Sequence, residues 1–360
     1  MSIQIGTGVT IGSVTMTDQP LQAVAVATDG SPYVTAYRWN SATGFGTKYA
    51  NPSVLPASQT QDVTFNPSGT AVAVVHNGTP YVSVYSWSWL SGFGAKYSDP
   101  AVLPAGGGYG VAFNRSNSVI AMAHATTPFV SAWAWSDSTG FGTKYANPSS
   151  LPTGTGRSVV FSNTGNAIVV SHNTSPYVTA YPWSDSGGFG TKYADPPTVP
   201  LSPGYDAAFS PSDNAIVVGF GTATPFVYAY AWSNSTGFGT KYADPATPPT
   251  GSSTGVTFDS TGTVVATANL DPTGSPVRIN AWAWNSSTGF GTKYSDPASV
   301  PTSPCYSIAF APSNDAIAVS SSSSPYVYAY PWSNSTGFGT KYSDPSVLPG
   351  GFGNSVTFSP

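Results

Sequence analysis

The feature that most constrains the fold of this chain is a short stretch centred on Gly-Phe-Gly, which returns seven times at nearly equal spacing. One copy, residues 183–196, reads WSDSGGFGTKYADP. Successive copies are 48 residues apart, except for one step of 49 and one of 52, and their central phenylalanines are Phe45, Phe93, Phe141, Phe189, Phe238, Phe290 and Phe338. Seven units of one supersecondary size, without a change of composition, predict a closed repeat structure that forms one domain over residues 1–360.

Each repeat contains four short β-strand patterns. In the second copy they cover residues 62–65, 71–75, 81–87 and 93–97, separated by turn sequences such as Asn-Pro-Ser-Gly. Alternating apolar residues, frequent turn signals and no helical periodicity are typical of antiparallel blades. We therefore expect an all-β fold, a seven-bladed β-propeller of four-stranded antiparallel blades.

The third strand of each repeat alternates large and small side chains. Tyr37 and Trp39 share one face, and Ala36 lies on the other, because side chains alternate along a strand. A tryptophan ends this strand in every copy: Trp39, Trp87, Trp135, Trp183, Trp232, Trp284 and Trp332. We interpret these tryptophans as packing between blades, with ligand stacking as the alternative.

Each fourth strand carries one lysine, which we interpret as protection of an exposed sheet edge, with a functional basic ring as the alternative. These are Lys48, Lys96, Lys144, Lys192, Lys241, Lys293 and Lys341.

The two ends of the chain both contain a copy of the first strand. Residues 353–360 match the internal copies through Phe358, and residues 12–16 match them less closely. Only one can fill the innermost place of the first blade. We expect residues 355–360 to close the ring with residues 21–56, and the surplus strand to pack outside the blade or on a neighbouring molecule.

Composition excludes several classes of function. Charged residues are 7% of the chain and the formal net charge is −4, so there is no basic surface for nucleic acid or an anionic membrane. One cysteine allows neither a disulfide framework nor a paired-thiol metal site. The N-terminus has no secretory signal pattern and no segment has the length of a membrane span, so we expect a protein made soluble in the cytoplasm.

Differences between the copies gather on one face of the predicted ring, in the inter-blade loops and the connections before the third strand. Such loops on a rigid scaffold are where binding specificity usually lies. The candidate ligand-binding residues on this face are Tyr109, Arg157, Tyr205, Tyr306, Phe352, His76, His124, His172 and Asp271.

No candidate metal or catalytic centre follows from these residues. The three histidines are 48 residues apart, in successive blades, so they cannot converge on one zinc ion. The Gly-Phe-Gly-Thr-Lys segment is not followed by a helix that would bind phosphate. Because Ser, His and Asp occur here as repeats, we expect no enzyme activity, no metal and no cofactor.

The inner strand Val63-Thr-Phe-Asn-Pro-Ser-Gly69 resembles the V-x-F-S-P-D-G strand and turn of WD40-like β-propellers, and the strand ending at Trp39 or Trp87 resembles the one that ends in their Trp-Asp. The Gly-His and Trp-Asp signatures are missing, so the family's hydrogen-bond network does not carry over. The Ser/Thr/Gly-rich, aromatic and weakly charged repeats are similar to phage and bacterial surface propellers.

These observations lead to the hypothesis of a non-enzymatic binding or structural propeller on a virion or extracellular surface, part of a larger particle. Its variable face would meet a protein partner or a surface glycan. The alternatives are a carbohydrate-binding lectin and an intracellular protein-interaction scaffold.

Overall fold

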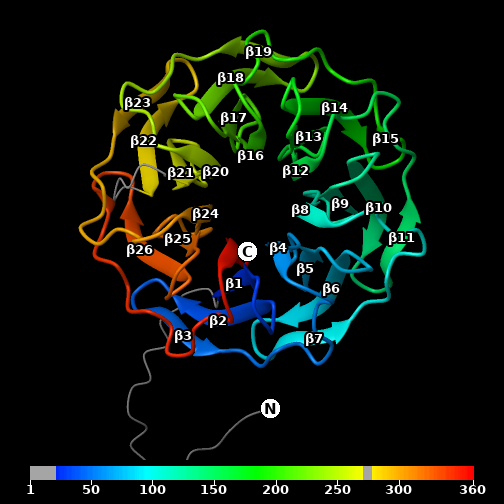
Figure 1. Ribbon diagram of the computed structural model, residues 1–360, viewed down its shortest axis with the longest axis vertical. Helices are drawn as coiled ribbons and strands as arrows, with labels where there is room; N and C mark the ends of the chain where they lie inside the picture. The colour runs from blue at the N-terminus through cyan, green and yellow to red at the C-terminus, as the bar shows by residue number, and fades with distance from the viewer. Residues whose placement is uncertain (1–21, 271–277) are drawn as a thin grey trace, which may run out of the picture.

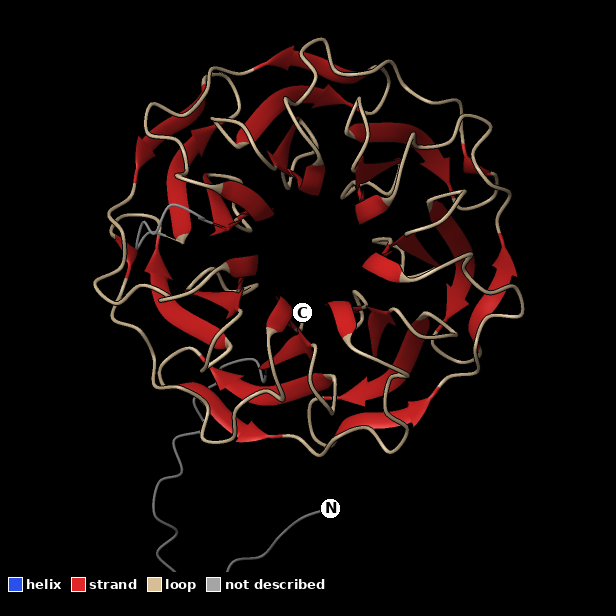
Figure 2. Cartoon of the chain, in the orientation of Figure 1, coloured by secondary structure: helices blue, strands red, loops and turns tan. Residues whose placement is uncertain are grey.

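The computed structural model describes residues 22–270 and 278–360, which form a closed ring of seven four-stranded antiparallel sheets (Figure 1). Strands and loops make up the whole described chain (Figure 2). The predicted all-β, seven-bladed propeller is confirmed. Blade 1 contains β28, β1, β2 and β3, and blades 2 to 7 follow in chain order with four strands each.

The four strands of each blade run outward from the axis of the ring. The innermost strands are β28 (Gly353–Phe358), β4 (Thr60–Phe65), β8 (Gly108–Phe113), β12 (Gly156–Phe161), β16 (Gly204–Phe209), β20 (Ser252–Phe258) and β24 (Cys305–Phe310). The second strands are β1 (Gln22–Thr28), β5 (Ala71–His76), β9 (Val119–His124), β13 (Ala167–His172), β17 (Ala215–Phe220), β21 (Val264–Leu270) and β25 (Ala316–Ser321). The third strands are β2 (Val34–Asn40), β6 (Val82–Ser88), β10 (Val130–Ser136), β14 (Val178–Ser184), β18 (Val227–Ser233), β22 (Ile279–Asn285) and β26 (Val327–Ser333). The outermost strands are β3 (Gly44–Lys48), β7 (Gly92–Lys96), β11 (Gly140–Lys144), β15 (Gly188–Phe189), β19 (Gly237–Lys241), β23 (Gly289–Lys293) and β27 (Gly337–Phe338).

The C-terminal strand closes the ring, as expected. β28 pairs antiparallel with β1, with Phe358 opposite Val24 and Val356 opposite Val26. Beyond the strand, Ser359 accepts a hydrogen bond from the Ala23 amide through Oγ at 2.8 Å and donates its own amide to the Ala23 carbonyl at 2.8 Å. The competing N-terminal copy, residues 12–16, lies outside the described residues.

The repeated tryptophans pack between blades. The Trp87 ring lies 5.1 Å from Phe65 and 5.0 Å from Phe93 of its own blade, and 5.0 Å from Tyr49 of the preceding blade, each in an edge-to-face arrangement. The same three ring contacts recur in all seven blades, and each tryptophan is at most 6% exposed. The predicted packing role is therefore confirmed, and no stacking face of these residues is left for a ligand.

The tyrosine that follows each outer-strand lysine joins two blades. Tyr97 Oη, for example, donates to the Asp137 carbonyl of the next blade at 2.7 Å. The seven such tyrosines are Tyr49, Tyr97, Tyr145, Tyr193, Tyr242, Tyr294 and Tyr342.

The outer-strand lysines do not form a free basic ring. Lys144 Nζ donates to Asn147 Oδ1 at 2.6 Å, and every other lysine bonds in the same way to the Asp or Asn three residues later. Their charges are thus held along the outer edges of the blades.

Candidate functional site

Two consecutive residues of each innermost strand face the axis of the ring. Two consecutive side chains can face the axis because strand pairing is irregular at this point. The register shifts between Thr60 and Asp62 in blade 2, for example, and between Gly204 and Asp206 in blade 5. In such a bulge two residues oppose one on the partner strand, so neighbouring side chains emerge on the same side. The sequence analysis did not predict these bulges.

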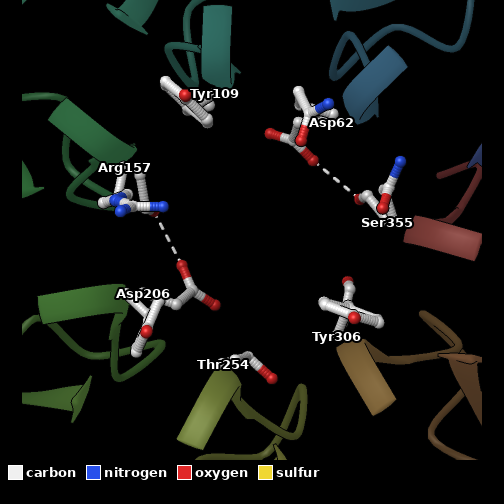
Figure 3. Close-up of a pocket in the computed structure, with 13 residues that line it drawn as sticks. Asp62, Tyr109, Arg157, Asp206, Thr254, Tyr306 and Ser355 are labelled. Carbon is white, nitrogen blue, oxygen red and sulfur yellow. Dashed lines mark hydrogen bonds between the residues drawn. The ribbon is translucent and has the colours of Figure 1, made fainter. Parts of the chain in front are cut away.

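The result is two stacked layers of side chains around the axis. The upper layer contains Asn354, Gln61, Tyr109, Arg157, Tyr205, Thr254 and Tyr306, and the second layer contains Ser355, Asp62, Gly110, Ser158, Asp206, Gly255 and Ser307. All but Gly255 line one hollow of ≈ 100 Å³ (Figure 3). A second hollow of ≈ 200 Å³ shares the upper layer and adds Leu270. We call this pair of hollows the axial site.

Arg157 is the cationic group of the axial site. Its guanidinium carbon lies 5.3 Å from the centre of the Tyr109 ring and 5.5 Å from that of Tyr205, in the two neighbouring blades. Cation–π contacts of this kind hold a guanidinium in place without neutralising its charge. Arg157 forms no ion pair with another described residue, and its Nε is buried without a hydrogen-bond partner. Arg157 is therefore poised to bind an anionic or electron-rich group.

Asp206 lies one blade further on, in the second layer. Its Oδ1 accepts from Ser158 Oγ at 2.7 Å, the bond drawn in Figure 3, and from the Ala207 amide at 2.9 Å, while Oδ2 accepts from the Val256 amide at 2.9 Å. Burial raises the pKa of Asp206 to about 6, although the hydrogen bonds oppose this rise. Asp206 is thus a carboxylate at neutral pH with an increased affinity for a proton.

Asp62 is the counterpart of Asp206 on the far side of the axis. It accepts from Ser355 Oγ at 2.7 Å and from the amides of Val63 and Val111, each at 2.9 Å. Burial raises its pKa as well. The upper-layer residues of its own blade and the two neighbouring blades are Gln61, Asn354 and Tyr109, so no guanidinium accompanies it in the adjoining positions.

The structure brings together four of the nine residues that the sequence analysis selected. Tyr109, Arg157, Tyr205 and Tyr306 all line the axial site. The sequence analysis missed Asp62 and Asp206. Only these two of the seven copies carry a carboxylate at that position of the inner strand, and this break in repeat symmetry was visible in the sequence.

The other selected residues lie elsewhere. His76, His124 and His172 are fully buried inside blades 2, 3 and 4, where Nε2 of each bonds a hydroxyl of the third strand, at 3.1 Å to Ser83, 3.0 Å to Ser131 and 2.9 Å to Thr179. They cannot reach a ligand on the face of the ring. Phe352 is 48% exposed but does not line the axial site, and Asp271 lies outside the described residues.

Burial explains the state of the histidines. It lowers the pKa of His76, His124 and His172 to about 4, because the charged imidazolium is disfavoured away from water. The described residues contain no group of three His, Cys, Asp or Glu side chains that could hold a metal ion. None of the chain that the structure describes forms a helix with the length and hydropathy of a membrane span.

No protein-family model and no curated protein matches the sequence. Solved structures do match the fold. A candidate 6-phosphogluconolactonase from Bacteroides uniformis aligns over 94% of this chain and 100% of its own, with a TM-score of 0.70 and 15% identity. The periplasmic gluconolactonase PpgL from Pseudomonas aeruginosa aligns over 94% and 99%, with a TM-score of 0.70 and 16% identity. A candidate 6-phosphogluconolactonase from Bacteroides fragilis aligns over 96% and 99%, with a TM-score of 0.71 and 11% identity.

These similarities correct two predictions. The expectation of a non-enzymatic protein, with its lectin and scaffold alternatives, is wrong, because the ring is similar to propellers that are named as lactonases. The narrower resemblance to WD40-like and phage-type propellers is not supported either. The sequence analysis took the regular repetition of Ser, His and Asp as evidence against enzyme activity, and this inference was wrong. Chemistry requires only a local departure from symmetry, and Arg157 and Asp206 supply one at the axis.

Proposed function

We propose that the axial site hydrolyses a small lactone. The observation that carries this proposal is the placement of Arg157 and Asp206 in adjacent blades around one hollow, a cation without an acidic partner beside a carboxylate whose pKa is raised to about 6. The names of the similar propellers support a sugar lactone as the class of substrate to test first.

Asp206 would act as the general base. Its carboxylate takes a proton from a water molecule as the water oxygen attacks the carbonyl carbon of the lactone. A base with a pKa near the working pH is efficient in this role. When the ring C–O bond breaks, the protonated Asp206 returns the proton to the alkoxide oxygen that leaves. The products are one hydroxy acid and the restored carboxylate, so protons and atoms balance.

Arg157 would stabilise the negative charge that develops on the carbonyl oxygen. The guanidinium is already fixed between Tyr109 and Tyr205, so little reorganisation is needed at the moment of reaction. The hydroxyl groups of Tyr306 and Thr254 line the same hollow and are suited to bind the hydroxyls of a sugar ring.

The test is hydrolysis of glucono-1,5-lactone and its 6-phosphate by the full chain, followed in a pH-stat against the spontaneous rate without protein. Arg157→Gln and Asp206→Asn are each expected to lower kcat/KM by about a hundredfold or more. A wild-type rate equal to the spontaneous rate for both lactones would refute the proposal.

Asp62→Asn is the matched control. It removes a carboxylate that accepts from one serine hydroxyl and two backbone amides, as Asp206 does, and that has the equivalent position in its own blade, but without Arg157 in a neighbouring blade. We expect this variant to keep kcat/KM within a few-fold of wild type. Equal losses in Asp62→Asn and Asp206→Asn would mean that both carboxylates only hold the blades together.

A further inference from the structure

The lower face of the ring, opposite the upper layer of the axial site, carries six equivalent turns between innermost and second strands. In each turn one residue has a left-handed backbone, with φ between +52° and +72°: Gly69, Asn117, Gly165, Asp213, Gly262 and Asn314. The side chain at this position, or its absence, decides what fills the space between two neighbouring blades. Five of the six spaces are filled.

Asn117 shows how a side chain fills the space between blades 2 and 3. Its amide nitrogen donates to Asp137 Oδ2 at 2.9 Å and to Ser68 Oγ at 3.0 Å, and its amide oxygen accepts from Asn66 Nδ2 at 3.0 Å. All polar atoms of the carboxamide are therefore bonded.

The other filled turns use a polar side chain or a proline. Asn314 donates to Asp259 Oδ2 at 3.1 Å, and Asp213 accepts from the amides of Asn163 and Thr164, each at 2.8 Å. At the two glycine turns a proline ring of the neighbouring blade closes the space. Pro360 lies 3.5 Å from the position of a Cβ on Gly69, and Pro211 lies 3.2 Å from that on Gly262.

Gly165 differs from all of these. A Cβ at this position would have no atom within 4 Å, and a hollow of ≈ 390 Å³ lies beside it, lined by Ser116, Thr164, Gly165, Asn166, Ser184, Asp185 and Ser186. We call this hollow the Gly165 site.

The groups that bind the Asn117 carboxamide have exact counterparts here. Asp185 Oδ2 corresponds to Asp137 Oδ2, and it accepts from Ser116 Oγ at 2.8 Å and Ser118 Oγ at 2.6 Å. Asn114 Nδ2, the counterpart of Asn66 Nδ2, donates to Asp185 Oδ1 at 2.9 Å. Burial alone would raise the pKa of Asp185, but its hydrogen bonds lower it below the usual value, so the carboxylate is ionised at neutral pH.

We infer that the Gly165 site binds a primary carboxamide. The Asn117 side chain between blades 2 and 3 serves as the template for the bound group. The amide nitrogen of the ligand donates to Asp185 Oδ2 and Ser116 Oγ, and its oxygen accepts from Asn114 Nδ2. The site is independent of the lactonase proposal, because it lies on the opposite face and shares no residue with the axial site.

The probes are acetamide and N-acetylasparagine N-methylamide, titrated into ¹⁵N-labelled full chain while backbone amide shifts are recorded. Saturable shifts at Gly165, Asn166 and Ser186 are expected with acetamide. Equal shifts with the asparagine derivative would mean that a side chain on a peptide also fits, and shifts with acetamide alone would restrict the site to small free amides. N,N-dimethylacetamide lacks both donors and should bind at least about tenfold more weakly.

Three variants make the test decisive. Gly165→Asn should fill the site with its own side chain and abolish the shifts, whereas Gly165→Ala leaves the hollow open and should keep them. Asn117→Gly should open an equivalent hollow and add a second set of shifts around Asp137. No saturable shift with acetamide, equal affinity for dimethylacetamide, or unchanged binding in Gly165→Asn would overturn the inference.

Discussion

In blades 2 and 5, two residues at equivalent places differ together as a matched pair. In blade 2, His76 at the end of the second strand faces Ser83 of the third strand. In blade 5 the same two positions are occupied by Phe220 and Tyr228. Each pair satisfies itself inside its own blade, by a hydrogen bond in the first case and a ring contact in the second. Differences between copies can therefore reflect packing within a blade as well as ligand binding, and the three histidines are residues of this internal packing.

The buried histidines predict a loss of stability in acid. Their folded-state pKa of about 4 lies below the value of 6.5 in the unfolded chain, so their neutral forms stabilise the fold fully above pH 6.5. This contribution falls as the pH drops from 6.5 towards 4, by up to about 3 kcal/mol for each histidine. We expect the melting temperature to decrease over this range.

The measurement compares wild type with a triple His→Asn variant at His76, His124 and His172 by calorimetry between pH 7 and 4. Asparagine is chosen because it does not titrate and because Asn269 of blade 6 already occupies the position equivalent to these histidines, where it is buried. The variant should show a clearly flatter dependence on pH. Parallel curves would assign the acid sensitivity to other groups.

Asp206 predicts a separate dependence of activity on pH. As a base it must be ionised, and burial raises its pKa to about 6. The value of kcat/KM for the lactone, corrected for the spontaneous rate, should therefore fall roughly tenfold for each pH unit below 6 and level off above 7. A flat profile between pH 5 and 7 would exclude Asp206 as the base.

Among the elements, the innermost strand of blade 1 closes the ring, because it pairs with a strand from the opposite end of the chain. Phe358 is 6% exposed and contacts the Trp39 ring edge-to-face at 5.1 Å. Phe358→Ala should lower the free energy of unfolding by about 3–5 kcal/mol. Thr357→Ala, on the axial side of the same strand, should change it by less than about 1 kcal/mol. Guanidinium unfolding curves followed by tryptophan fluorescence measure both, and similar small effects would show that the strand adds little to closure.

Sequence periodicity predicted the elements well and their irregularities poorly. Turn residues, alternation and seven copies at nearly equal spacing were sufficient to place four strands in each blade and to choose residues 355–360 as the closing strand. They could not predict the bulges at the start of the inner strands, because a bulge depends on pairing between strands. The sequence analysis selected neither Gln61 nor Asp62, although both line the axial site.

At the scale of the whole molecule, the second axial layer shows an order that the 48-residue repeat does not. Around the ring it reads Ser355, Asp62, Gly110, Ser158, Asp206, Gly255 and Ser307, that is, Ser-Asp-Gly twice and then Ser. Each aspartate accepts from the serine of the preceding blade and from a backbone amide of the following blade. Each set therefore ties three blades together.

The glycine of each set provides the space that this arrangement needs. A Cβ on Gly110 would lie 2.8 Å from Ser158 Cα and 3.1 Å from the Arg157 carbonyl oxygen, which are backbone atoms of the next blade. Gly110→Ala should therefore destabilise the ring by about 1–3 kcal/mol through overpacking. Ser307→Ala, in the same layer, is the control and should be nearly neutral. Thermal unfolding of the two variants checks this, and an unaffected Gly110→Ala would mean that blades 3 and 4 can separate freely.

The closing strand also has a consequence for synthesis of the chain. β28 follows every other strand in the sequence, yet its partner β1 is the first described strand and is buried along its whole length. During translation, β1 must wait for more than three hundred residues with one hydrogen-bonding edge unpaired. At about 5–20 residues per second this interval lasts roughly 15 seconds to a minute. An unpaired apolar edge invites pairing with other chains, so the nascent protein depends on late, rapid closure or on a chaperone that covers β1 until β28 has left the ribosome.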